Sequence, residues 1–101
     1  VLVSAGYDAH WRDRLADLRV SVAGFGRAVT ALLASAAELC AGRMALTLEG
    51  GYDLPALSHG VAATFAALLG RPYRDPLGPS PRPGHDAVEQ IAAVAALHGL
   101  R

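Results

Sequence analysis

The sequence predicts an α/β fold with a mainly parallel sheet, and three observations support this prediction. The chain opens on a short apolar run with β-branched residues, Val1–Val3. A long stretch with apolar residues at three- and four-residue spacing follows, and a second short apolar run then covers Arg43–Leu48 before another helical pattern begins. Alternation of short apolar strands with amphipathic helices is typical of parallel α/β units.

The first predicted strand begins at the first residue of the sequence. A buried parallel strand needs neighbouring strands and helices that cover both faces. We therefore expect residues 1–101 to be a fragment from which the preceding chain has been cut away. The segment 4–17 that follows this strand is rich in polar and charged residues and is predicted to be a loop.

Two helices are delimited by residues that typically start and end helices. Ser21 is a suitable N-cap for the first helix, and Gly42 is a typical residue just past its end. Asp53 can cap the second helix, with Pro55 in its first turn and Gly70 at its end. The expected apolar faces are Val22, Phe25, Val29, Leu32, Leu33, Ala36, Leu39 and Cys40 in the first helix, and Leu57, Val61, Phe65, Leu68 and Leu69 in the second.

The last third of the chain changes character. Five prolines between residues 71 and 84 predict an irregular surface connection. Asp86 and Glu89 have the spacing of a capping box, which predicts a terminal helix over 86–99. The expected apolar face of this helix is Val88, Ile91, Val94 and Leu97, with Val88, Ile91, Ala95 and His98 as the alternative.

Composition limits the classes of partner. The formal net charge of the 101 residues is zero, which gives no support for direct nucleic-acid binding or for an anionic membrane surface. No apolar run reaches the roughly 20 residues that span a bilayer. The single cysteine, Cys40, excludes a disulfide within the chain and favours a reducing, cytoplasmic setting. Oligomeric state is not indicated by the sequence.

Two loops are expected at the same edge of the sheet, because both follow directly after predicted strands. The first carries Asp8 and His10. A carboxylate just past a buried strand is well placed to bind zinc in a cleft, where a catalytic zinc keeps one position open for water or substrate. The alternative interpretation is that Asp8 caps a turn and His10 is a solvated loop residue.

The second loop is the run Glu49-Gly50-Gly51-Tyr52. Adjacent glycines allow positive φ and close approach of the backbone to a ligand. A tyrosine hydroxyl on such a turn can donate to a developing oxyanion, and preorganised donors of this kind are often a large catalytic contribution. The alternative is a simple tight turn in which the ring of Tyr52 packs on the core and its hydroxyl faces solvent.

Together the two segments resemble a known family. The run Ser4-Ala5-Gly6-Tyr7-Asp8-Ala9-His10, followed by Leu15-Ala16-Asp17-Leu18, is similar to the S-A-G-F-D-A-H…P-L-A-D-L stretch of histone deacetylases, acetoin utilisation proteins and acetylpolyamine amidohydrolases. The run Leu48-Glu49-Gly50-Gly51-Tyr52-Asp53-Leu54 is similar to their L-E-G-G-Y-D-L stretch. The order also matches, and the resemblance covers the chain to about Gly70.

The resemblance implies the arginase-deacetylase fold, a three-layer α/β/α arrangement of which this chain would be the C-terminal part. It implies that Asp8 is a ligand of Zn²⁺ and that Tyr52 polarises the substrate carbonyl and stabilises the oxyanion. Gly50 and Gly51 would shape the acyl pocket. The implied reaction is hydrolysis of an N-acetyl amide on a protein lysine, a polyamine or another small amine. His10 matches the motif but is expected to support the loop and not to bind the metal.

This sequence departs from the family pattern in the first loop. Tyr7 stands where phenylalanine is usual, and Trp11-Arg12-Asp13-Arg14 stands where the family tends to show R-D-D-P. Arg14 in place of proline is expected to loosen the loop, and Trp11 adds an aromatic ring. Because this loop is expected near the rim of the site, the departures bear on substrate preference more than on chemistry.

Part of the family's site has no counterpart here. The family takes two further zinc ligands from an earlier D-x-H element and uses a histidine pair as general acid and base. No adjacent pair exists among the four histidines His10, His59, His85 and His98. A catalytic zinc typically needs three protein ligands. We therefore expect the isolated chain to bind zinc weakly and to be inactive, with the remaining ligands supplied by residues upstream of Val1.

Two other functions stay open from the sequence. An arginase-like amidinohydrolase shares the architecture but uses clustered aspartates of D-x-D-x-x-D type, whereas Asp13 and Asp17 are displaced from Asp8. A non-catalytic α/β module could bind a partner through its apolar helices. Metal analysis would separate the deacetylase from the interaction module, since only the deacetylase needs stoichiometric zinc.

Overall fold

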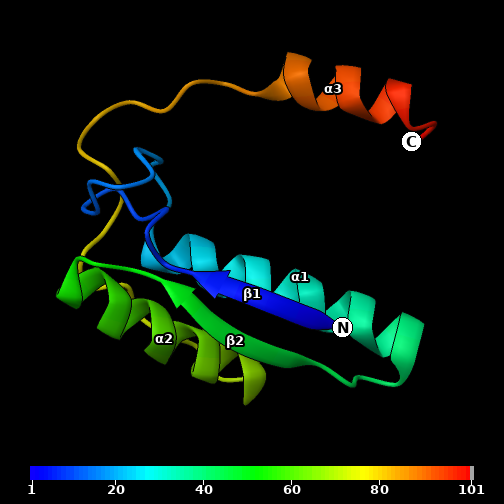
Figure 1. Cartoon of the computed structure of the whole chain (residues 1–101), viewed down its shortest axis with the longest axis horizontal. Helices are drawn as coiled ribbons and strands as arrows, with labels where there is room; N and C mark the ends of the chain where they lie inside the picture. Colours follow the sequence, from blue (N-terminus) through cyan, green and yellow to red (C-terminus); the bar gives the residue numbers. More distant parts are fainter. Residues whose placement is uncertain (101) are drawn as a thin grey trace.

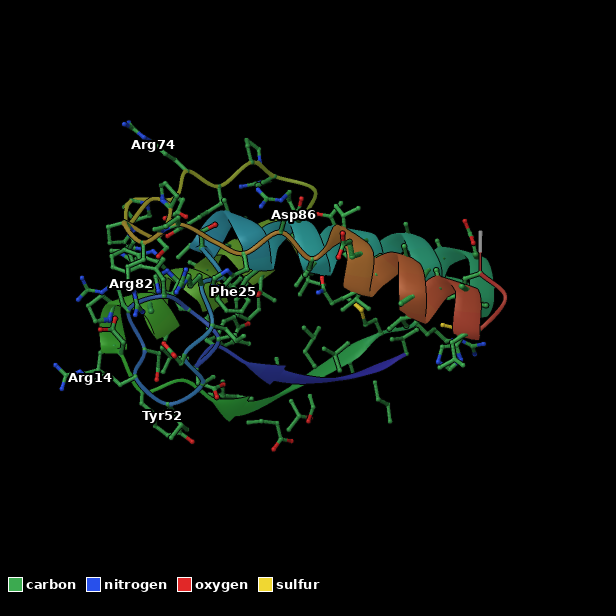
Figure 2. The ribbon with its side chains drawn as sticks, turned by 90° about the horizontal axis from the view of Figure 1, so that it is seen from above. Arg14, Phe25, Tyr52, Arg74, Arg82 and Asp86 are labelled. Carbon is green, nitrogen blue, oxygen red and sulfur yellow. The ribbon has the colours of Figure 1, made fainter. Side chains whose placement is uncertain are left out.

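The computed structural model describes residues 1–100 and confirms an α/β chain with a parallel sheet. Its elements, in order, are β1 (Leu2–Gly6), α1 (Val22–Cys40), β2 (Ala45–Gly50), α2 (Leu54–Leu68) and α3 (Val88–Leu97). Figures 1 and 2 together show α1 and α2 on the same side of the two-stranded sheet, with α3 set apart at the end of an extended segment in Figure 1.

Strand β1 is longer than the sequence predicted, and β2 has the predicted length but lies two residues further along the chain. They pair in parallel from Leu2 opposite Ala45 to Gly6 opposite Gly50, with an irregularity between Ala5 and Gly6. Residues 4–6, expected in a loop, therefore belong to β1, and residues 49–50, expected in a turn, belong to β2. Small residues and glycine have low strand propensity, and pairing with the neighbouring strand overrides it.

The predicted starts of the first two helices are confirmed. Ser21 Oγ accepts a hydrogen bond from Gly24 N at 3.1 Å, and Asp53 Oδ1 accepts one from Ala56 N at 2.9 Å. Helix α1 ends at Cys40, and both Ala41 and Gly42 take left-handed φ values of 54° and 76°. Their N–H groups both bond to the Ala36 carbonyl, which satisfies one of the orphan acceptors at the helix end.

The buried residues of α1 all lie on its predicted apolar face, whereas those of α2 are small residues outside its predicted face. The buried positions are Val22, Val29 and Ala36 in α1, and Ala56, Gly60, Ala63 and Thr64 in α2. A Cβ on Gly26 would already lie 4.0 Å from the Cβ of Ala63, so the two helices approach closely here. Leu39 and Phe65, both predicted on apolar faces, remain 78% and 61% exposed. Close helix contact therefore buries small residues of α2 and leaves several large side chains of both helices outside.

Helix α3 is shorter than predicted, and its predicted capping box does not form. The helix begins at Val88 with Ala87 as the N-cap, and no side chain caps it. Asp86 Oδ1 instead accepts a hydrogen bond from Val88 N at 3.0 Å, two residues along the chain. This local bond competes with the three-residue bond that a capping box needs. Within residues 1–100, α3 packs against no other helix or strand and has no buried residue.

Helix α1 is also long and apolar enough, by length and composition, to cross a membrane, with a mean hydropathy of 1.3. The expectation that no segment reaches such a length is wrong by this measure, which averages over Arg27 and Glu38. The measure is weak evidence for a membrane span, because core helices of soluble proteins also meet it. Here α1 packs against α2 beside the sheet, as the crossover helix of a parallel unit does.

Candidate functional site

The pairing of the two strands brings Asp8 and Tyr52 to the same edge of the sheet. Gly6 and Gly50 are paired at the strand ends, and Asp8 and Tyr52 each lie two residues further on. The Tyr7 N–H continues the pairing by donating to the Gly50 carbonyl at 2.8 Å. A Cβ built on Gly50 would lie 3.1 Å from Asp8 Oδ1 and 3.7 Å from the Tyr52 hydroxyl oxygen. Both polar groups therefore border the small volume that the missing side chain of Gly50 leaves free.

The carboxylate of Asp8 lies beside the glycines at the two strand ends. It is half-buried, and among residues 1–100 it takes part in no side-chain hydrogen bond or ion pair, so it does not cap a turn. A Cβ on Gly6 would lie only 2.8 Å from Asp8 Oδ1, so glycine on both strands keeps space around this oxygen. A carboxylate oxygen is a suitable donor for Zn²⁺. No group of three or more metal-binding side chains occurs within residues 1–100.

Tyr52 projects from the turn between β2 and α2 and is 63% exposed, so its ring is not packed in the core. Gly51, immediately before it, has a φ of 134°, which disfavours any side chain. A Cβ on Gly51 would lie 3.0 Å from Leu57 Cδ1 and 3.1 Å from Tyr7 Cβ, so this residue faces the protein interior. The two glycines thus have different surroundings. Gly50 lies beside Asp8 and the Tyr52 hydroxyl, and Gly51 is packed against Tyr7 and Leu57.

An open cleft of about 610 Å³ lies beside Tyr52. Its lining residues are Arg12, Asp13, Arg14, Leu15, Tyr52 and Asp53. Figure 2 shows Arg14 and Tyr52 at the same end of the molecule. Arg12 Nε donates to Asp53 Oδ1 at 3.1 Å, and this bond is the main reason that the pKa of Asp53 lies below its ordinary value. Residues 12–15 of the first loop therefore form one wall of this cleft.

Asp13 links the two loops, a role that no local sequence pattern indicates. Its carboxylate is buried, with 6% of the residue exposed. Oδ2 accepts hydrogen bonds from Tyr52 N at 2.7 Å and from Asp53 N at 3.0 Å, and Oδ1 accepts one from Leu15 N at 3.0 Å. The bond from Leu15 is the largest of the effects that lower the pKa of Asp13. The bonds of Asp13 to Tyr52 and Asp53 could not be predicted from the sequence, because an aspartate in a polar loop has many possible local partners.

His10 is completely buried, so its interpretation as a solvated loop residue is wrong. Its Nδ1 accepts a hydrogen bond from Arg12 N at 3.1 Å, and its ring stacks on Phe25 with centroids 6.4 Å apart. Burial lowers the pKa of this imidazole, which favours the neutral form. His10 therefore supports the loop between Asp8 and Asp13.

The tyrosine at position 7 has a specific partner for the hydroxyl that phenylalanine would lack. The Tyr7 hydroxyl lies 2.7 Å from Thr64 Oγ1, and both residues are buried. Thr64 in turn donates to the Gly60 carbonyl at 3.0 Å, so the Tyr7 hydroxyl donates in this chain of bonds. A Cβ on Gly60 would lie 2.5 Å from Tyr7 Cδ1. The Tyr7 ring therefore occupies the space that a side chain at position 60 would need.

The proline-rich segment reaches back to the site. Trp11 Nε1 donates to the Gly78 carbonyl at 3.0 Å, so the added aromatic ring ties the first loop to this segment. Asp75 accepts three backbone hydrogen bonds, from Ala23 N at the start of α1 and from Leu77 N and Gly78 N. Figure 1 shows the segment passing beside the first loop. The predicted irregular connection is thus anchored at both Trp11 and Asp75.

The other candidate residues do not join the site. His59 Nδ1 lies 2.8 Å from the Tyr73 hydroxyl on the outer side of α2, and His85 and His98 are exposed. Asp17 is exposed and forms an ion pair with Arg82 at 3.5 Å, while Asp13 is committed to backbone N–H groups. Within the described residues the aspartates of the first loop therefore do not form the clustered set of a two-metal amidinohydrolase.

Comparisons with known proteins agree with this architecture. The Histone deacetylase domain family matches residues 1–68, which carry both loops. The chain is 43% identical to Histone deacetylase 10, chloroplastic, of Oryza sativa subsp. japonica, over 99% of this chain and 24% of that protein. It is 49% identical to Histone deacetylase 14, chloroplastic, of Arabidopsis thaliana, over 69% of this chain and 16% of that protein.

Solved structures give the same result. The crystal structure of the HDA15 HD domain superposes with a TM-score of 0.70 and 31% identity, over 96% of this chain and 24% of that one. The fold is therefore part of a deacetylase domain of the arginase-deacetylase type. This chain belongs to the histone deacetylase family. It spans about a quarter or less of the length of the relatives it matches.

Proposed function

We propose that this chain supplies one zinc ligand, Asp8, and one catalytic tyrosine, Tyr52, to a zinc-dependent deacetylase that hydrolyses N-acetyl amides. The observation that carries the proposal is the position of Gly50. The space that a Cβ at Gly50 would fill borders both Asp8 Oδ1 and the Tyr52 hydroxyl, so the proposed ligand carboxylate and the proposed oxyanion donor lie beside the same space. Membership of the histone deacetylase family supports the deacetylase class.

The proposed reaction adds water to the acetyl carbonyl carbon and breaks the C–N bond, which yields acetate and the free amine. When bound, zinc supplies Lewis acidity and lowers the pKa of the attacking water. The Tyr52 hydroxyl donates a hydrogen bond to the carbonyl oxygen as negative charge develops on it. Asp8 contributes its carboxylate oxygen to the metal, and Gly50 leaves room for the acetyl group beside both residues.

The remaining ligands and the general base are proposed to come from residues upstream of Val1, in the rest of the same deacetylase domain. Exposed apolar side chains support this arrangement, since Leu2 on β1 and Leu48 on β2 are 88% and 60% exposed. A single carboxylate falls short of the three protein ligands that catalytic zinc typically has. The isolated chain is accordingly proposed to be inactive.

The proposed substrates are acetylated amines, with protein acetyl-lysine, acetylpolyamines and other small acetyl amides as the candidate carriers. A cytoplasmic setting is proposed from the single cysteine, Cys40. Two similar plant deacetylases are named as chloroplastic, which concerns those proteins.

The test is the substitution Tyr52→Phe in the full-length protein. Removal of one oxyanion donor is expected to lower kcat by about 10²- to 10³-fold. Bound zinc, measured by elemental analysis of the purified protein, is expected to stay stoichiometric. Loss of zinc in this variant would assign Tyr52 a structural role. A wild-type protein with neither zinc nor deacetylase activity would favour the non-catalytic interaction module instead.

A further inference from the structure

The turn that presents Tyr52 has little support of its own. Two glycines precede the tyrosine, and Gly51 has the unusual φ of 134°. The Tyr52 side chain is 63% exposed, so packing of its ring does not fix the turn. A catalytic hydroxyl must nevertheless be held within about 0.5 Å and 10–20° of its productive geometry. Something other than the ring must therefore fix the backbone at this point.

The carboxylate of Asp13 meets this need. One oxygen, Oδ2, accepts from two consecutive N–H groups, those of Tyr52 at 2.7 Å and Asp53 at 3.0 Å. Asp53 is itself fixed as the N-cap of α2 and by Arg12, which lies one residue before Asp13. The first loop and the tyrosine turn are thus joined by three side-chain bonds between residues 39 to 41 positions apart in the sequence.

The second carboxylate oxygen fixes Asp13 in turn. Oδ1 accepts from Leu15 N at 3.0 Å, so both oxygens are committed and the side chain has no freedom to turn away. An ionised carboxylate has enough lone pairs for three such donors, whereas an asparagine would place an NH₂ group against at least one N–H. The lowered pKa of Asp13, due first to the Leu15 bond, agrees with an ionised group.

We infer that Asp13 is a positioning residue that sets the orientation of the Tyr52 hydroxyl and thereby acts on turnover. The inference rests on the proposed function of Tyr52. Asp13 itself contributes hydrogen bonds to the backbone only, so it acts through the tyrosine and is not a catalytic residue. Loss of its carboxylate leaves Asp8 in place and lets the turn between β2 and α2 move.

The experiment is a double-mutant cycle in the full-length protein with Asp13→Asn, Tyr52→Phe and the double variant, assayed on an acetyl-lysine peptide. Asp13→Asn is expected to lower kcat by about 10- to 100-fold, because a displacement near 1 Å has this order of effect, while KM changes little. In the Tyr52→Phe background the same substitution is expected to lower kcat by less than about 2-fold, since no hydroxyl remains to be positioned. Zinc content is expected to stay stoichiometric in all variants.

Asp75→Asn is the matched control. Asp75 also accepts three backbone N–H bonds, but these lie at the start of α1 and in the proline-rich segment. It is expected to lower the denaturant midpoint about as much as Asp13→Asn does, with kcat unchanged. If Asp13→Asn does not fold, Asp13→Glu takes its place in the cycle, since it keeps the charge and shifts the oxygens.

The outcomes separate this inference from the function on which it rests. Loss of kcat by the same factor in both backgrounds, or loss of zinc in Asp13→Asn, overturns the role of Asp13 and leaves that of Tyr52 standing. Full activity of Tyr52→Phe overturns both. The positioning role is supported if Asp13→Asn lowers kcat only when the Tyr52 hydroxyl is present, and Asp75→Asn does not lower kcat.

Discussion

Residues 1–70, which form the sheet and helices α1 and α2, differ from the terminal helix α3 in the hydrogen bonds of their polar side chains. In residues 1–70, buried or half-buried polar side chains form hydrogen bonds to backbone groups far along the chain, as Asp13 does with Tyr52. In α3 the hydrogen bonds are local, the N-cap makes no side-chain bond, and its apolar side chains Val88, Ile91, Val94 and Leu97 are 55–81% exposed.

The helices therefore differ in what stabilises them, which is tertiary contact for α1 and α2 and intrinsic propensity for α3. Helices α1 and α2 are held by mutual packing and by caps that are themselves tied to other segments, as Asp75 ties the start of α1. Helix α3 relies on intrinsic propensity within residues 1–100, and isolated helices of its length are marginal in water. Asp13 and Asp53, which join the two loops, accordingly lie where tertiary contacts also hold the backbone.

The largest effect on stability is expected from Gly60→Ala. The new Cβ would lie 2.5 Å from Tyr7 Cδ1, and the ring cannot move away without breaking its bond to Thr64. Overpacking of this kind typically costs about 1–3 kcal/mol, which exceeds the roughly 1 kcal/mol gained in helix propensity. Urea unfolding of the full-length protein measures the change.

Gly26→Ala is the control for this substitution. It also replaces a glycine inside a helix, but its Cβ would meet only the Cβ of Ala63 at 4.0 Å, an ordinary contact. We expect it to leave the free energy of unfolding unchanged or to raise it by up to about 1 kcal/mol. Equal destabilisation by both substitutions would contradict the special role of the Tyr7 ring.

A smaller effect on the free energy of unfolding is expected when the pH is lowered. The pKa values of Asp13 and Asp53 are lowered, chiefly by the Leu15 N–H and by Arg12, respectively. For Asp75, burial raises the pKa, but bonds from the N–H groups of Ala23, Gly78 and Leu77 outweigh it and the net shift is downward. The unfolded chain thus binds more protons near pH 4, so the stabilisation is complete above about pH 4 and is lost as the pH falls towards the lowered values.

Urea midpoints measured between pH 3 and pH 7 test this dependence. Asp13→Asn and Asp75→Asn should each flatten the acid side of the curve, because an amide does not titrate. An unchanged acid slope in both variants would show that other carboxylates govern it.

The smallest effect is expected in α3. Ile91 is 65% exposed and contacts no other helix or strand within residues 1–100. In the isolated chain, Ile91→Ser is therefore expected to change the free energy of unfolding by no more than about 0.5 kcal/mol. A loss above 1.4 kcal/mol, which is tenfold in the folding equilibrium, would show that this face is packed in solution.

The sequence by itself determined the order of elements, the caps at Ser21 and Asp53, and the placement of Asp8 and Tyr52 just past strand ends. These features depend on hydrophobic period and on side-chain bonds across three residues, both of which are local. The family followed from the two loop motifs together, and the comparisons confirmed it. The roles of Asp8, Tyr52, Gly50 and Gly51 remain predictions.

The tertiary structure alone decided the strand ends, the buried face of α2 and the partners of Asp13, His10 and Tyr7. Pairing of Gly6 with Gly50 extended both strands into residues with low strand propensity. Close approach of α1 and α2 selected small residues for burial. Asp13 could reach Tyr52 only because the crossover through α1 returns the chain to the same edge, a contact between residues 39 positions apart that no local pattern encodes.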